Sequence, residues 1–182
     1  MTVVGLDLAG LQSNPTGFAS LINREFKTGL VHSNEEIFEL FSRSRSTLAA
    51  IDAPLSLPVN GNLRQADRLL IKRGLRVLPP TFAGMKKLTA RGIIVAVELR
   101  ERGVGIIEVH PRTSGRILFG TAERKEWLKS LRKKGWIVGR DMSEHEVDAI
   151  IAALTGWLHL TGRTEEIGAF DEGTIVIPRG PL

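Results

Sequence analysis

The stretch "MTVVGLDLAG", residues 1–10, opens with an apolar run that ends on a single carboxylate, Asp7, followed by small residues. Two later apolar runs end in the same way: "STLAAID" reaches Asp52, and "GVGIIEVHP" reaches Glu108. A buried carboxylate without a partner is costly, so such a group is paired, solvated or bound to a cation. Three strand endings of this kind favour one common explanation.

The order of elements around these runs predicts a mixed α/β fold. A short amphipathic helix over residues 33–45, with Ser33 or Asn34 as N-cap, separates three early strands from a fourth. The resulting β-β-β-α-β order interleaves strands with helices, which is typical of α/β domains. The predicted strands are residues 2–7, 14–22, 25–32, 46–52 and 103–111, and a last strand at 173–178 closes the chain.

The middle of the chain, about residues 55–103, is predicted to be a helical insertion. Proline and glycine interrupt its first part, and a block of this size is too small to fold alone. We therefore expect a single domain over residues 1–182. The remaining helices are predicted at 63–74, which ends at Gly74, and at 85–102, 112–119 and 122–134.

The best-marked helix covers residues 142–162. Ser143 and Glu146 form a capping box at its start, and apolar residues at helical spacing form its buried face. His145 and Asp148 are three residues apart and therefore lie on one side of this helix, at the border of the core. Two polar groups are unusual in that position.

Composition limits the classes of protein and site. The 182 residues include no cysteine, so disulfides are excluded and any metal site must use oxygen or imidazole ligands. No signal peptide and no apolar run of about 20 residues is present, so we expect a soluble, cytoplasmic protein without a membrane partner. The net charge is +5, and residues 112–140 hold nine Lys or Arg against two acids, which is compatible with a polyanionic partner.

Four carboxylates are the candidate metal ligands. Asp7, Asp52 and Glu108 lie at the carboxyl ends of predicted strands, where open α/β sheets bind ligands, and Asp148 is a fourth on its helix. If they converge, they repel one another unless a divalent cation such as Mg²⁺ or Mn²⁺ neutralises them. Each alone also fits a turn, a helix cap or a paired edge carboxylate, and His145 also fits an exposed position. Their joint occurrence favours one site.

Five segments, "GLDLAG", "AIDAPLSLP", "RQADRLL", "IIEVHP" and "EVDAIIAAL", occur in this order. In them the sequence resembles domain-of-unknown-function family 429, from residue 3 to the closing "IVIP". The resemblance implies a ribonuclease H-like fold, a mixed five-stranded sheet flanked by helices with a helical insertion, and a nuclease activity that is itself inferred for that family. The His145–Asp148 pair is also similar to the last helix of Holliday-junction resolvases.

The resemblance also implies roles for the acids. Asp7 is the ligand on the first strand, Asp52 belongs to the central strand, Glu108 to a later strand and Asp148 to the last helix. Two divalent ions can activate a water and stabilise the leaving oxygen of a phosphodiester. We expect Asp7 to bridge both ions, Asp52 and Glu108 to complete one shell and Asp148 the other. His145 would position the attacking water or accept its proton.

Two basic stripes are candidates for contacts with the phosphates of RNA or DNA. A solvated helix face explains either stripe equally well, and Arg64 with Asp67 also fits the rim of the site or an ion pair within a helix. The stripes are Arg64, Arg68 and Lys72 in the insertion, and Lys125, Lys129, Arg132 and Lys133 in the helix at 122–134.

Three alternatives remain open from the sequence. "GLDLAGLQSNPTGFA" is similar to the first hairpin of sugar kinases and actin-like ATPases, which suggests a single-domain phosphotransferase or ATPase. A non-catalytic nucleic-acid-binding protein and an α/β domain with an unrelated small-molecule pocket are the others. The sequence leaves the oligomeric state open, a homodimer included.

Overall fold

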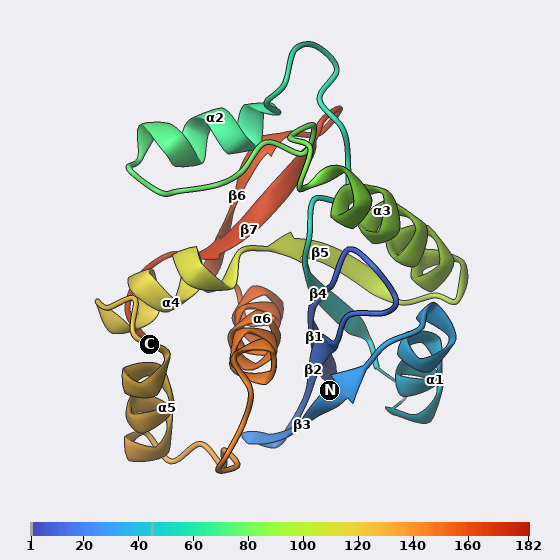
Figure 1. Ribbon diagram of the computed structural model, residues 1–182. Coiled ribbons are helices and arrows are strands. Elements are labelled where there is room, and N and C mark those ends of the chain that lie inside the picture. Colours follow the sequence, from blue (N-terminus) through green and yellow to red (C-terminus); the bar gives the residue numbers. More distant parts are fainter. Residues whose placement is uncertain (1, 45) are drawn as a thin grey trace.

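A single mixed sheet organises the chain (Figure 1). The computed structural model describes residues 2–44 and 46–182, and within these ranges seven strands pair in the order β3-β2-β1-β4-β5-β7-β6. Strands β1, β4, β5 and β7 run parallel, while β2, β3 and β6 pair antiparallel with their neighbours. The strands are β1 (Val3–Asp7), β2 (Thr16–Ile22), β3 (Glu25–Val31), β4 (Leu48–Asp52), β5 (Gly105–Val109), β6 (Thr164–Ala169) and β7 (Gly173–Pro178).

Helices cover both faces of this sheet (Figure 1). On one face, α1 and α3 pack against β1 and β4, and on the other α6 crosses β1, β2 and β4, with α4 and α5 outside it. Helix α2 packs on β6 and β7 at the far edge. The helices are α1 (Asn34–Ser44), α2 (Gln65–Lys72), α3 (Lys86–Glu101), α4 (Pro111–Phe119), α5 (Arg124–Lys133) and α6 (Glu144–Leu160).

Strand β1 is apolar along its length because both of its faces are covered. Val4 and Leu6 enter the core beneath α1 and α3, while Gly5 faces α6. A Cβ atom on Gly5 would lie 2.2 Å from the carbonyl oxygen of Ala149. Helix α6 therefore rests almost directly on the backbone of β1.

The capping box predicted at the start of α6 is confirmed. Ser143 Oγ accepts from the Glu146 N–H, and the Glu146 carboxylate accepts from the Ser143 N–H at 2.9 Å. Glu146 also accepts a 2.8 Å hydrogen bond from the hydroxyl of Thr28 on β3. The first turn of α6 is thus fixed both within the helix and to the sheet, which determines where His145 and Asp148 point.

Within the described residues the sheet has seven strands, more than the five that the family resemblance implies. The predicted closing strand, β7, pairs with β5, and β6 adds an edge strand that the sequence did not indicate. The β6 segment begins "TEEIGA", and its two adjacent glutamates hide the alternation that identifies a strand. Met1, the first residue of the predicted domain, lies outside the described residues, and so does Arg45, the last residue of the predicted helix 33–45. No described helix is long and apolar enough to cross a bilayer.

The close contact of β1 with α6 gives a stability test. Gly5→Ala places a methyl group into the backbone of α6, so the helix must move, and we expect a loss of about 3 kcal/mol or more in the free energy of unfolding. Gly180→Ala is the control, because nothing lies within 4 Å of a Cβ there. Urea denaturation measures both, and equal stabilities would contradict this packing.

Candidate active site

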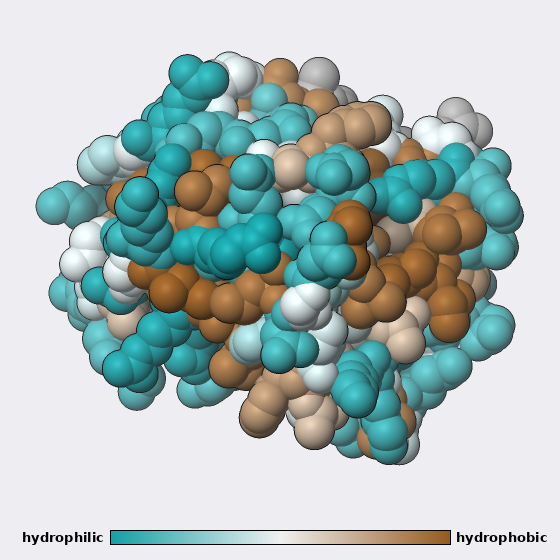
Figure 2. Space-filling view, turned by 90° about the horizontal axis from the view of Figure 1, so that it is seen from above, coloured by the Kyte–Doolittle hydropathy of each residue, from teal (hydrophilic) through white to brown (hydrophobic). Residues whose placement is uncertain are grey.

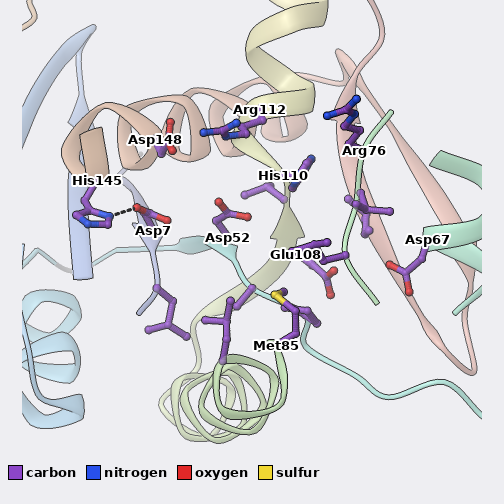
Figure 3. Close-up of a pocket in the computed structure, with 18 of the residues that line it drawn as sticks. Asp7, Asp52, Asp67, Arg76, Met85, Glu108, His110, Arg112, His145 and Asp148 are labelled. Carbon is purple, nitrogen blue, oxygen red and sulfur yellow. Dashed lines mark hydrogen bonds and ion pairs between the residues drawn. The ribbon is translucent and has the colours of Figure 1, made fainter. Parts of the chain in front are cut away.

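Asp7 and Asp52 lie side by side at the carboxyl edge of the sheet. They are register partners on the parallel strands β1 and β4, so their side chains leave the same face. That face is the one covered by α6. Both line a pocket of about 740 Å³, and Figure 3 shows their carboxylates close to one another.

Asp148 is the third acid of this pocket, contributed by α6. It is buried in the second turn of the helix, above the two strand ends (Figure 3). The negative charge of Asp148 raises the pKa of Asp7, although burial contributes more and the His145 hydrogen bond opposes both. The structure therefore brings together three of the four acids that the sequence singled out.

Asp52 differs from its neighbours in having no hydrogen-bond or ion-pair partner among the described residues. Burial raises the pKa of its carboxyl well above the ordinary 3.8, and the charges of Asp7 and Asp148 raise it further. Asp7 and Asp148 each have a partner of their own. Asp52 is thus the acid of this group whose charge has no partner in the described part of the protein.

His145 is placed as its spacing from Asp148 predicted, on the side of α6 that faces the pocket. Its Nδ1 lies 2.6 Å from Oδ2 of Asp7, while half of its side chain stays exposed. The approach depends on Gly17 of β2, where a Cβ atom would lie 2.2 Å from the His145 carbonyl oxygen. A glycine beside Asp7 is thus what allows the start of α6 to reach the strand ends.

Arg124 was not predicted as a site residue, yet it holds Asp148. Its Nε and one terminal nitrogen donate to the two oxygens of Asp148 at 2.8 and 2.6 Å, and another nitrogen lies 3.1 Å from Glu144. The hydrogen bond to Asp148 raises the pKa of the guanidinium. In the sequence Arg124 is one of several residues of a basic run, and only the packing of α5 on α6 distinguishes it.

Glu108 lines the same pocket as the other three acids, but it enters from the other face of the sheet. It pairs in register with Ile51 and not with Asp52, so its side chain leaves the opposite face of the sheet (Figure 3). Its two oxygens accept from Arg64 at 2.6 and 2.7 Å, and the Leu55 N–H donates to one of them at 2.8 Å. Glu108 thus has partners of its own in this structure, and its predicted role as a metal ligand beside Asp52 stays a prediction.

Arg64 is likewise not available to a substrate phosphate. It is 1% exposed and donates to Asp67 as well as to Glu108, with distances of 2.6–3.1 Å. Burial alone lowers the pKa of a guanidinium, but the two carboxylates outweigh it and raise the pKa of Arg64. The ion pair within the helix, one of the alternatives considered, is the arrangement found. It joins α2 to β5.

The other predicted substrate-binding residues are exposed but lie outside the lining of the acidic pocket. Several have local partners, such as Arg68 with Glu172 and Lys129 with Glu126, each at 3.5 Å. Their contact with nucleic acid stays a prediction. These residues are Arg68, Lys72, Lys125, Lys129, Arg132 and Lys133.

Three basic residues that the sequence did not single out line the pocket: Arg76, His110 and Arg112. His110 directly follows β5. Its Nδ1 and the hydroxyl of Thr113 are joined by a 2.7 Å hydrogen bond. Burial and the charge of Arg112 lower its pKa to about 4, so its imidazole is neutral at neutral pH. The segment "IIEVHP" was noted for Glu108, and its histidine went unassigned.

The outer wall of the pocket is apolar and belongs to the middle segment of the chain. Leu78, Met85 and Leu88 line it opposite the acids. Leu78 and Phe82 are more than half exposed. Figure 2 shows such apolar side chains scattered among hydrophilic ones on the upper side of the molecule. The pocket therefore has a charged inner edge and an apolar rim.

The donor atoms of the pocket are those that a divalent cation prefers, but they are not all gathered around one point. Among the described residues, no three His, Asp or Glu side chains are already close enough to share one ion. Asp7 and Asp52 nevertheless supply adjacent hard oxygen donors, and the unpartnered Asp52 lacks a compensating charge. These two residues fit a cation as they stand, whereas Asp148 fits only after leaving Arg124.

Comparisons with known proteins agree on the fold. The structure of Thermus thermophilus RuvC in complex with a Holliday junction substrate matches with a TM-score of 0.55 and 16% identity, covering 89% of this chain and 96% of that one. A second Thermus thermophilus RuvC structure matches with a TM-score of 0.50 and 16% identity, covering 89% and 97%. Neither the family models nor the curated proteins give a match. The ribonuclease H-like fold class is confirmed.

The buried ion pairs of Arg64 predict a large loss of stability on mutation. Arg64→Met leaves Asp67 and Glu108 buried without a counter-charge, and we expect the free energy of unfolding to fall by about 3–5 kcal/mol. Arg73→Gln breaks the exposed pair with Glu165 and should cost about 1 kcal/mol or less. Chemical denaturation compares them, and equal losses would contradict the burial of Arg64.

The raised pKa of Asp52 predicts that this residue makes the protein less stable as the pH rises. A salt-bridged acid, whose pKa is lowered, has the opposite effect. Because the pKa of Asp52 is raised in the folded state, the folded protein binds more protons than the unfolded chain, and stability falls as the pH rises above 3.8. In EDTA, Asp52→Asn should therefore be more stable than the wild type at pH 7.5, with the gap closing towards pH 4. Thermal denaturation across this range measures it. A variant that is less stable at pH 7.5 would contradict the prediction.

Proposed function

We propose that this protein is a divalent-metal-dependent nuclease that hydrolyses phosphodiester bonds. The observation that carries the proposal is the group of Asp7, Asp52 and Asp148 in one pocket, with Asp52 unpartnered. Like charges at such short range destabilise a folded protein unless something compensates them. Destabilising groups of this kind are characteristic of functional sites, and a cation is the compensation that carboxylates suit best.

Asp7 and Asp52 are the residues that would hold the first ion, since their register places both carboxylates on one face. Asp148 would join a second ion on the side of α6. When bound, divalent ions activate a water and stabilise the leaving oxygen of a phosphodiester. Arg124 holds Asp148 until then and supplies positive charge in its place.

His145 is the residue that would move a proton. Its Nδ1 is hydrogen-bonded to Asp7, which fixes the ring and leaves Nε2 to accept a proton from a water molecule. Half of the side chain is exposed, so a proton taken there can pass to solvent. The imidazole thus stands beside the acids, with Nε2 free to act on a water molecule.

Two similarities to other proteins support the proposed nuclease activity. One of the RuvC structures is of a complex with a Holliday junction substrate, so a chain of this fold is known to take nucleic acid. The sequence resemblance to domain-of-unknown-function family 429 points to a nuclease of the same fold. We extend both to this chain as a proposal: a nucleic acid is the substrate, and Mg²⁺ or Mn²⁺ the cofactor.

Cleavage and metal binding test the proposal together. With Mn²⁺ or Mg²⁺ we expect the protein to cleave one of single-stranded DNA, duplex DNA, RNA or a four-way junction. Asp7→Asn and Asp52→Asn should each reduce the rate by about 100-fold or more, because each removes a proposed ligand. The exposed Asp171 provides the control, and Asp171→Asn should cleave at the wild-type rate.

Titration calorimetry with Mn²⁺ separates the alternatives. Binding that Asp52→Asn abolishes, together with cleavage, supports a nuclease. Binding of metal and nucleic acid without cleavage would favour a non-catalytic protein, and metal-dependent phosphate release from ATP would favour a phosphotransferase or ATPase. Absence of Mn²⁺ binding, or binding unchanged in Asp7→Asn, would overturn the metal site.

A further inference from the structure

Three arginines near the acids have no hydrogen-bond or ion-pair partner among the described residues: Arg76, Arg112 and Arg116. All three are exposed. In contrast, two other arginines of the pocket are already paired: Arg64 with Glu108, and Arg124 with Asp148. An arginine without a protein partner keeps its five donors available for a ligand. We call these three residues the arginine channel.

The arginine channel is continuous with the acidic pocket. A second pocket of about 320 Å³ is lined by all three arginines, and it shares Arg76, His110 and Arg112 with the first. Arg112 and Arg116 are four residues apart on α4 and so lie on one face of that helix. In Figure 3, Arg112 lies above Asp52, and Arg76 lies further away beyond His110. The channel thus leads away from the acids.

Its charge is positive throughout. No Asp or Glu lines the second pocket, and its histidine, His110, is neutral at neutral pH. Three guanidinium groups gather there without compensation. Guanidinium groups bind phosphate oxygens through two parallel hydrogen bonds, and they are less strongly hydrated than ammonium groups. The chemistry of the channel therefore suits phosphate.

We propose that the arginine channel binds backbone phosphates of the nucleic acid next to the one that is cleaved. The inference rests on the proposed function, since it places the scissile phosphate at Asp7, Asp52 and Asp148. Arg112, which is close to Asp52, contacts the phosphate nearest the acids, and Arg116 and Arg76 contact the strand beyond it. The channel thus sets which stretch of the strand lies over the acids.

The arginine channel is a different phosphate-binding surface from the lysine-rich stripe that the sequence predicted on α5. That stripe lies outside the lining of both pockets. The channel is linked to the acids through the residues that the two pockets share. Free nucleotides carry the same phosphate chemistry, but the channel runs away from the acids over two joined pockets, which favours a polymer.

Binding can be measured without cleavage in EDTA. We would titrate fluorescein-labelled single-stranded DNA, RNA and four-way junctions and follow anisotropy at several salt concentrations. Arg112→Gln/Arg116→Gln should weaken binding about 10-fold or more and lower the slope of log K against log salt by about 1.4–1.8, the value for two lost phosphate contacts. Arg76→Gln should act in the same direction.

The matched control is Arg43→Gln/Arg102→Gln. It removes the same charge from the ends of α1 and α3, just before β4 and β5 begin, at the opposite edge of the sheet. Its affinity should stay within about twofold of the wild type, and its salt slope should fall by much less. Thermal denaturation confirms that each variant is folded. Arg43 and Arg102 are exposed, and each pairs with a glutamate of its own helix, so their loss should change stability little.

The outcomes separate this inference from the proposed function. If the wild type binds and cleaves nucleic acid while Arg112→Gln/Arg116→Gln binds equally well, the channel assignment is wrong and the nuclease proposal stands. If ATP or inorganic phosphate binds through these arginines but oligonucleotides do not, the site takes free phosphate compounds and the polymer assignment is overturned. If neither binds, the channel assignment is wrong, and cleavage with Mn²⁺ decides the nuclease proposal separately. Loss of binding confined to the channel variants supports the assignment.

Discussion

The close approach of α6 to the first two strands is the constraint on which the site depends. Gly5 and Gly17 have no side chain where the backbone of α6 passes, at Ala149 and at His145. Any side chain at either position would displace the helix. Because the helix cannot move away, its first turns are held over the end of β1. Asp148 and His145 therefore meet Asp7 and Asp52 as a consequence of backbone contact and not of attraction between the side chains.

Around β5 the same structure separates two kinds of carboxylate. Glu108 and Asp67 share Arg64 on one side of the sheet, where both acids and the arginine are buried and satisfied. Such a buried cluster fixes α2 against the sheet, and removal of the cation would leave two charges exposed to an apolar interior. On the other side, Asp52 has no such arginine. The acids at Arg64 are thus compensated by an arginine and Asp52 is not, although both groups line one pocket.

Much of this could be predicted from the sequence, because the relevant signals are local. Apolar runs marked β1 and β4, Ser143 and Glu146 marked the start of α6, and the spacing of His145 from Asp148 fixed their common face. The face of Glu108 could not be predicted, since it depends on the register in which β5 pairs with β4. A shift of one residue turns every side chain to the other face. Arg124 and the arginine channel depend on helix packing, which no local pattern reports.

The charges of the pocket give a reason for metal and phosphate to bind together. Asp7, Asp52 and Asp148 stand opposite Arg124 and Arg112, so the free site is partly balanced by its own arginines. Under the proposed function, a cation at the aspartates releases Arg124 from Asp148, which leaves Arg124 paired with Glu144 alone. A phosphodiester is the group that restores the balance. Binding of either ligand then lowers the electrostatic cost of binding the other, and linkage requires that this coupling be reciprocal.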